Sequence, residues 1–135
     1  MARQIFVNLP VKDLKRSVAF FTALGYRFDP KFTDENATCM IVGDNIFVML
    51  LVESFFKTFT KKALCDATTS TEVLVCLSCD SRAHVDELVT KARAAGGTTP
   101  NEPQDHGFMY GHGYQDLDGH LWELVYMEPT AENRA

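Results

Sequence analysis

Residues 5–25 read IFVNLPVKDLKRSVAFFTALG, and the same order of features returns in residues 72–97, EVLVCLSCDSRAHVDELVTKARAAGG. Each stretch begins with an apolar run typical of a strand, continues with apolar residues at helical spacing, and ends at glycine. Asp13 is suited to cap the first helix, and Asp80 or Ser81 the second. The apolar stripes expected on the two helices are Leu14, Val18, Phe21 and Leu24, and Val85, Leu88, Val89 and Ala92.

Three further extended runs follow each helix, and turn residues such as Asp118-Gly119 separate them. The unit strand, helix, strand, strand, strand therefore occurs twice, each copy being roughly 50 residues long, which indicates an internal duplication. We predict an α+β fold in which two paired βαβββ modules form a single domain, a curved sheet that bears a cleft. The expected extended runs are 26–32, 37–42, 45–51, 98–100, 108–115 and 120–126. The first module is 1–52 and the second is 72–127, with a linker or lid at 53–71 between them and a polar tail at 128–135.

The composition excludes several classes of protein. The chain has 135 residues, of which 46% are hydrophobic, so it can bury the core of one domain. A net charge of −5 makes nucleic acid and anionic membranes poor partners. The longest apolar run, 46–52, is too short to span a bilayer, and the first residues lack a signal peptide's apolar stretch, so we expect a cytoplasmic protein. We expect the cysteines to be reduced and buried: Cys39, Cys65, Cys76 and Cys79.

The linker carries three phenylalanines, Phe55, Phe56 and Phe59, among interleaved lysines. This pattern predicts a short amphipathic helix. Three neighbouring aromatic rings require a partner surface, which is the sheet of the same chain, a second subunit, or a ligand that the segment covers as a lid.

Two stretches resemble the vicinal oxygen chelate superfamily, whose members include glyoxalase I, extradiol dioxygenases, and fosfomycin- and bleomycin-resistance proteins. Residues 9–21, LPVKDLKRSVAFF, are similar to the opening motif of that family, and residues 116–124, DLDGHLWEL, to its closing motif. Leu117 stands where the family usually has proline. The resemblance implies the glyoxalase/bleomycin-resistance/dioxygenase-like fold and a homodimer.

The resemblance also locates the metal ligands of the family. They fall on Phe6, near Met49, on Leu74 and on Glu123. Only Glu123 could bind a hard or borderline divalent ion, because phenylalanine and leucine offer no lone pair and a thioether prefers soft ions. We therefore expect no cofactor, disfavour a divalent metal, and consider ordinary metal-dependent glyoxalase I activity unsupported. A relocated metal site that includes His112 is the alternative; the other histidines are His84, His106 and His120.

Strand alternation, combined with the resemblance, assigns residues to the cleft. The expected lining is mostly apolar, as in sites for small organic molecules. Inward-facing Tyr110 and His112 remain an alternative register. The predicted ligand-binding residues are Phe6, Asn8, Phe47, Met49, Leu74, Cys76, Met109, Gly111, Gly113, Leu121 and Glu123.

Glu123 is the candidate catalytic residue. A carboxylate among apolar side chains is expected to be desolvated, which suits a general acid or base. It could equally orient an amine or hydroxyl of a ligand, or be satisfied by Asn8 or a buried water.

Three functions follow from these observations. The favoured one is a glyoxalase/bleomycin-resistance-like protein that binds a small, largely apolar organic molecule. The second is a lyase, isomerase or dioxygenase that uses Glu123 or a relocated metal. The third is a structural or regulatory protein that docks a partner through the three phenylalanines.

Overall fold

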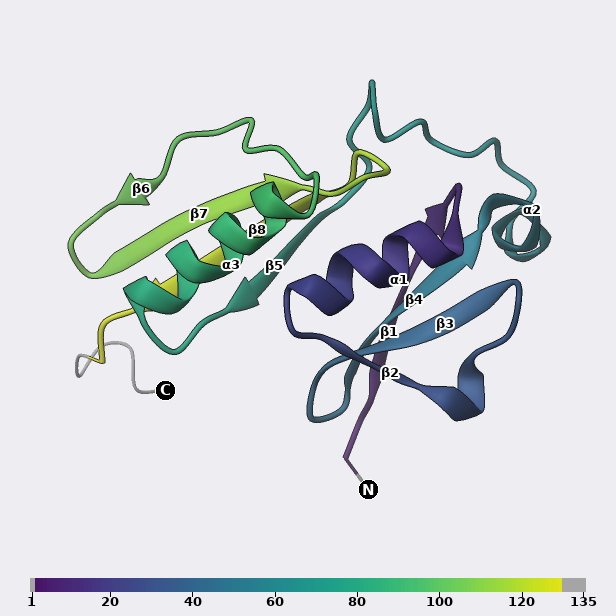
Figure 1. Cartoon of the computed structure of the whole chain (residues 1–135), viewed down its shortest axis with the longest axis horizontal. Helices are drawn as coiled ribbons and strands as arrows, with labels where there is room; N and C mark the ends of the chain where they lie inside the picture. Colours follow the sequence, from purple (N-terminus) through teal and green to yellow (C-terminus); the bar gives the residue numbers. More distant parts are fainter. Residues whose placement is uncertain (1, 130–135) are drawn as a thin grey trace. The chain divides into compact units, whose positions relative to one another are not determined.

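The structure, a computed structural model, describes residues 2–129. Most of the predicted tail therefore lies outside the described residues. The chain divides into two compact units, residues 1–64 and 65–135. Each unit contains a four-stranded mixed sheet, and Figure 1 shows one long helix lying across a face of each sheet. The predicted α+β class with two βαβββ modules is confirmed.

The first sheet has the strand order β1-β4-β3-β2, in which β1 and β4 are parallel and the other pairs are antiparallel. Parallel neighbours need a crossover, and the following strands and helix provide it. The elements are β1 (Ile5–Val11), α1 (Leu14–Ala23), β2 (Arg27–Asp29), a 3-10 helix (Pro30–Phe32), β3 (Ala37–Gly43) and β4 (Ile46–Val52).

Helix α1 begins and ends where the sequence predicts. The Asp13 carboxylate accepts a hydrogen bond from the Arg16 backbone N–H at 3.1 Å, and Gly25 has the left-handed φ of +104° that follows a helix end. The predicted stripe is partly wrong, because Leu14 and Val18 are only half-buried. The buried face is rotated around the helix to Ser17, Phe20, Phe21 and Leu24.

The linker helix is also present. Helix α2 (Glu53–Phe56) contacts β1 and β4, and a 3-10 turn (Lys57–Phe59) follows it. The Phe55 and Phe59 rings meet edge to face at 5.1 Å. Part of this aromatic segment therefore packs on the sheet of its own unit, while Phe59 remains exposed.

The second sheet repeats the first, with the order β5-β8-β7-β6 and parallel pairing of β5 with β8. Ser81, one of the two candidate caps, accepts the His84 backbone N–H at 3.0 Å. The predicted stripe Val85, Leu88, Val89 and Ala92 is buried. The elements are β5 (Leu74–Ser78), α3 (Arg82–Ala94), β6 (Gln104–Asp105), β7 (Met109–Gln115) and β8 (Leu121–Met127).

Three extended runs differ from expectation. The run 26–32 is a three-residue strand followed by a 3-10 helix, because Pro30 cannot donate to a sheet and the Asp29 carboxylate accepts the Lys31 N–H at 2.9 Å. The run 98–100 contributes only an isolated bridge between Thr98 and Gln115. The predicted strand 72–79 is shorter, since pairing begins at Leu74; β6 was not predicted at all.

The turn between β7 and β8 is built around the buried carboxylate of Asp116. One oxygen accepts the backbone N–H groups of Asp118 and His120, at 2.9 and 3.0 Å, and the other accepts the Trp122 indole N–H at 2.9 Å. Burial raises the pKa of Asp116. Gly119 completes the turn with φ of +92°, and the Ala67 carbonyl oxygen would lie 2.6 Å from any Cβ added there.

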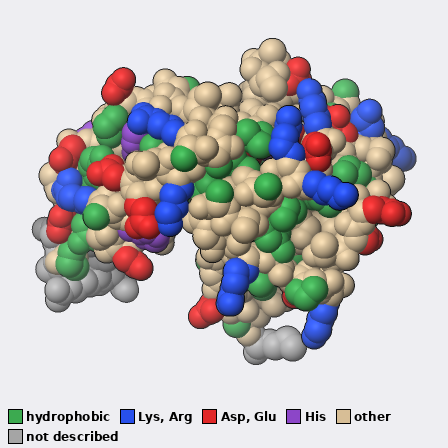
Figure 2. Space-filling view, viewed as in Figure 1, with side chains coloured by type: hydrophobic (Ala, Val, Ile, Leu, Met, Phe, Trp, Pro, Cys, Tyr) green, Lys and Arg blue, Asp and Glu red, His purple; other side chains and the backbone are tan. Residues whose placement is uncertain are grey.

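None of the helices described in residues 2–129 has the length and apolar character needed to cross a bilayer. Acidic and basic side chains lie among one another on the face shown in Figure 2.

Candidate functional site

The two faces of the second sheet differ. Helix α3 contacts β7 and β8, and the Tyr110 hydroxyl donates to the Asp86 carboxylate on that helix at 2.6 Å. Tyr114 and Trp122, which pair across the strands and stack with ring centroids 6.2 Å apart, are buried on the same side. Because strand residues alternate, Met109 and Glu123 lie on the face opposite α3, which we call the open face.

The strand register brings the second-unit residues of the predicted site together on the open face. Glu123 lies between Cys76 on β5 and Gly113 on β7, and Val125 is opposite Gly111. Leu74 and Leu121 form the next pair toward the turn. Tyr110 faces α3 instead, through its bond to Asp86, whereas His112 is among the residues that line the cavity described next.

A cavity of about 610 Å³ is lined by residues of the open face, by the loop before β7, and by His112, Tyr114, Trp122 and Leu124 at the alternate positions of β7 and β8. It includes six of the predicted ligand-binding residues: Leu74, Met109, Gly111, Gly113, Leu121 and Glu123. Cys76 is on the same face but does not line the cavity.

The two glycines form the floor of the cavity. A Cβ on Gly113 would collide with the Trp122 carbonyl oxygen, so no side chain fits there. A Cβ on Gly111 would meet only the Leu124 carbonyl oxygen and Val125, both at an ordinary 3.6 Å. The space above Gly111 is therefore empty rather than forbidden.

One wall of the cavity was not predicted from the sequence. It comes from the loop between α3 and β7, which has no strand or helix periodicity. A loop of this length next to a glycine-containing strand was the available signal, since long loops in compact domains often carry function. Its lining residues are Pro100, Asn101, Glu102, Gln104 and His106.

The remaining predicted residues lie on the first sheet. Phe6 and Phe47 are neighbours across β1 and β4, and their rings stack at 4.9 Å. Asn8 is opposite Met49 on the same pair of strands. The alternation of burial places all four on the side of that sheet opposite its buried Val48 and Leu50 residues.

Glu123 does not have the environment expected of it. Its side chain is exposed, so the desolvation proposed from its apolar neighbours is not found. Its charge acts on Cys76, whose pKa is raised first by burial and second by the Glu123 carboxylate. All four cysteines are free, as predicted, but only Cys39 is fully buried; Cys76 is exposed.

The histidines do not assemble a metal site with Glu123. His106 and His112 line the cavity, and His112 Nε2 lies 3.2 Å from the Asn101 carbonyl oxygen. His120 is buried at the β7–β8 turn, and the His84 Nδ1 accepts the Asp80 backbone N–H at 3.3 Å. Within residues 2–129, no three His, Cys, Asp or Glu side chains gather as a metal ion would require.

Comparison with known proteins agrees with this architecture. Residues 3–43 match the family model described as bleomycin resistance protein-like N-terminal. No curated protein sequence matches the chain. Among solved structures, a hypothetical protein from S. aureus is 30% identical, with 93% of this chain and 95% of that chain covered and a TM-score of 0.78.

Two further structures share the fold at lower identity. A glyoxalase/bleomycin resistance protein/dioxygenase family enzyme from Burkholderia phytofirmans is 16% identical, over 93% of this chain and 99% of that one, with a TM-score of 0.76. The fosfomycin resistance protein FosX from Mesorhizobium loti is 15% identical, over 99% and 98%, with a TM-score of 0.68. Two βαβββ sheets, the N-terminal family match and these structures lead to one conclusion: the chain belongs to the glyoxalase/bleomycin-resistance/dioxygenase proteins of the vicinal oxygen chelate superfamily.

Proposed function

We propose that the second unit binds a small, largely apolar organic molecule in the cavity over the open face. The observation that carries this proposal is the cavity itself, which lies over the strand face predicted to bind a ligand. Its volume is within the range of small-molecule sites, roughly 300–1,000 Å³. Leu74, Met109 and Leu121 supply apolar walls above a floor of backbone.

The polar groups of the cavity indicate which ligands suit it. Glu102 and Glu123 contribute carboxylates, and no lysine or arginine lines the cavity within the described residues. Carboxylates accept hydrogen bonds and attract cations, so they favour a ligand that carries a hydroxyl or an amine and disfavour an anion. Glu123 orients such a group in this proposal.

The proposal includes no metal. At the positions where the family resemblance puts metal ligands, Phe6 and Leu74 have no donor atom and Met49 has only a thioether. One carboxylate, Glu123, does not make a site for a hard or borderline divalent ion. The donor set does not fit the family metal, and no step is derived through one.

Fluorescence titration with 1-aminoanthracene, an apolar aromatic amine, tests the proposal. Wild-type protein is expected to give a saturable increase in emission with one site per chain. Gly111→Leu is expected to abolish it, because the added side chain would occupy space that is empty above the floor. Gly43→Leu is the matched control: Gly43 is at the end of β3, where a Cβ would also meet one side chain at 3.6 Å. Equal binding by wild type and Gly111→Leu, with circular dichroism unchanged, would contradict the proposed site.

An enzyme of the same superfamily, a lyase, isomerase or dioxygenase, is the alternative. It is favoured by one observation, an ionisable carboxylate on Glu123 that lines the cavity. In this alternative Glu123 transfers a proton to or from the substrate. Glu123→Gln should then bind substrate with little change in affinity and lose turnover by about 100-fold or more. Turnover that survives this substitution would exclude the role.

The homodimer and the cytoplasmic location implied earlier stay predictions. Light scattering of the purified chain measures the first directly, with a mass twice that of the chain as the expected result.

A further inference from the structure

The wall of the cavity that comes from residues 98–108, here called the strap, has little attachment to the sheet. Strand β6 within it has two residues, which pair with Tyr110 and Gly111 on β7. An isolated bridge joins Thr98 to Gln115 at the other end. Such short pairing at a sheet edge is weak by itself, so side chains must set the position of the strap.

Arg82, at the first turn of α3, holds the β6 end of the strap. Its Nη1 lies 3.0 Å from the Asp105 carboxylate, and its Nη2 donates to the Gly107 carbonyl oxygen at 2.7 Å. Its Nε donates to the Glu128 carboxylate at 3.3 Å, just after β8 ends. The guanidinium carbon also lies 5.4 Å from the centre of the Tyr110 ring. One side chain thus joins α3, the strap and the end of β8.

The partners of Arg82 are themselves oriented. The Tyr110 hydroxyl donates to the Asp86 carboxylate on α3 at 2.6 Å, which fixes the ring under the guanidinium. The second Asp105 oxygen accepts the Gly107 backbone N–H at 3.0 Å. This amide, followed by Arg82, lowers the pKa of Asp105, so the carboxylate is ionised at neutral pH.

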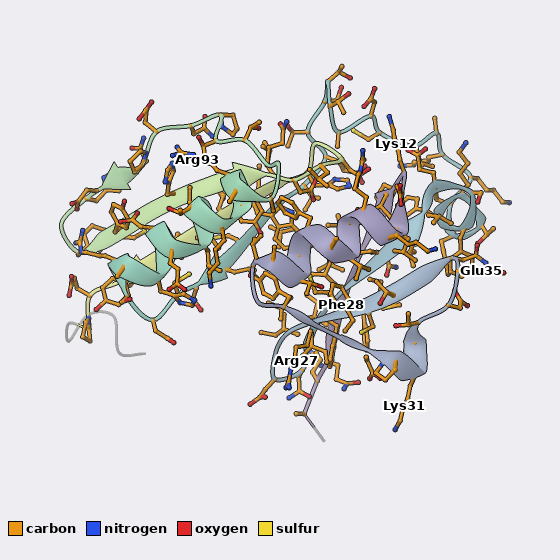
Figure 3. The ribbon with its side chains drawn as sticks, in the orientation of Figure 1. Lys12, Arg27, Phe28, Lys31, Glu35 and Arg93 are labelled. Atoms are coloured by element: carbon orange, nitrogen blue, oxygen red, sulfur yellow. The ribbon has the colours of Figure 1, made fainter. Side chains whose placement is uncertain are left out.

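The other end of the strap is also attached to α3. The Arg93 Nε and Nη2 donate to the Thr99 hydroxyl at 3.1 and 2.8 Å, and Figure 3 labels Arg93 beside the chain that leads from α3 to β6. Residues 100–104 span the interval between these two attachments to α3, and within that span the Asn101 carbonyl oxygen lies 3.2 Å from His112 Nε2 on β7. Glu102 and Gln104, which line the cavity, belong to that span.

We infer that Arg82 is a positioning residue for the cavity: from the face of the sheet opposite the ligand, it holds the strap in the place where Gln104 and His106 form a wall. Loss of this contact releases the β6 end of the strap and lets a bound molecule leave faster. The inference rests on the proposed function, because it deepens the account of the same cavity. A lysine cannot replace Arg82, since three donors in one plane serve two acceptors on the strap and one at the end of β8.

The test compares Arg82→Met with Lys91→Met. Lys91 is on the same helix, where its ammonium forms an exposed ion pair with Glu87 at 2.8 Å. Hydrogen exchange read by mass spectrometry should be about threefold to tenfold faster in residues 100–107 of Arg82→Met, because exposed charge-assisted bonds contribute modestly. Dissociation of 1-aminoanthracene, followed by stopped flow, should accelerate by a similar factor. Lys91→Met should change neither.

Each result of the exchange and dissociation measurements either supports or overturns the role of Arg82. Equal strap exchange in the two variants would overturn the role of Arg82, whatever the probe does. Faster exchange with unchanged dissociation would show that the strap does not govern the cavity, and would also overturn the inference. If wild type fails to bind the probe, the proposed function fails with this ligand class, while the exchange measurement still decides whether Arg82 holds the strap. Asp105→Asn keeps the shape of the partner and weakens one contact, so it provides the same test with a smaller effect if Arg82→Met does not fold.

Discussion

Replacing Asp116 with alanine removes the acceptor of three N–H groups at once. Two are the backbone N–H groups of Asp118 and His120, and the third is the Trp122 indole N–H. Asp116 is 6% exposed and Trp122 1%, so these donors do not reach bulk water. A buried donor left without an acceptor costs about 1–3 kcal/mol.

The expected net loss of unfolding free energy is smaller than the sum of three such costs. Water enters the space that the carboxylate leaves and accepts hydrogen bonds from some of the three N–H groups. Burial raises the pKa of Asp116, so the ionised group is itself costly to bury, and its removal recovers some free energy. We therefore expect Asp116→Ala to lower the free energy of unfolding by about 3 kcal/mol. Asp116→Asn keeps one acceptor oxygen and should lose about half as much.

Urea denaturation followed by tryptophan fluorescence measures this loss. Trp122 is the single tryptophan of the chain, so its emission reports on the affected turn. Asp66→Ala is the matched control, because the Asp66 carboxylate also accepts N–H and O–H bonds, from Thr68, but is exposed. It should cost less than about 1 kcal/mol. Equal losses from the two substitutions would refute the reasoning that burial makes the Asp116 bonds valuable.

Three other substitutions or reactions have defined outcomes. Gly119→Ala places a Cβ at a left-handed φ and against a backbone carbonyl, so it should cost about 2 kcal/mol or more in the same denaturation experiment; a loss below about 0.5 kcal/mol would contradict this. Ser81→Ala removes the acceptor of the His84 N–H and should cost about 1 kcal/mol, read as a lower melting temperature by circular dichroism. Burial raises the pKa of Cys79 to about 11. The rate of its alkylation by iodoacetamide, measured by peptide mapping, should therefore rise about tenfold per pH unit from about pH 8 to about pH 10. A rate that levels off in this interval would show a thiol of ordinary pKa.

The parts of the fold that depend on neighbouring residues were predictable. Asp13 and Ser81 each cap a helix by accepting an N–H three residues later, and Gly25 follows the end of α1 with a positive φ. Such capping interactions join residues only a few positions apart, so a short stretch of sequence is enough to predict them. Alternation with a period of two likewise placed Leu74 and Glu123 on one face, because the register of β5 and β8 preserves it.

The parts of the fold that depend on residues distant in the sequence were not predictable. Helical spacing fits a stripe through Val18 as well as one through Phe20, and only the sheet beneath α1 selects Phe20. Strand β6 exists because β7 offers it an edge, not because Gln104-Asp105 favours a strand. Arg82 pairs with Glu128, which is 46 positions away in the chain, and no local sequence pattern indicates such a pair. The wall of the candidate site was missed for this reason.

The bare backbone beneath the cavity has a consequence for selectivity. Side chains can change rotamer to suit a guest, but peptide planes cannot, so the depth at Gly111 and Gly113 is set by the twist of the sheet alone. Leu74, Met109 and Leu121 can adjust the outline around a bound molecule. For the ligand site that we propose, we therefore expect flat molecules of different outline to bind with similar affinity, and molecules that need a deeper floor to bind more weakly.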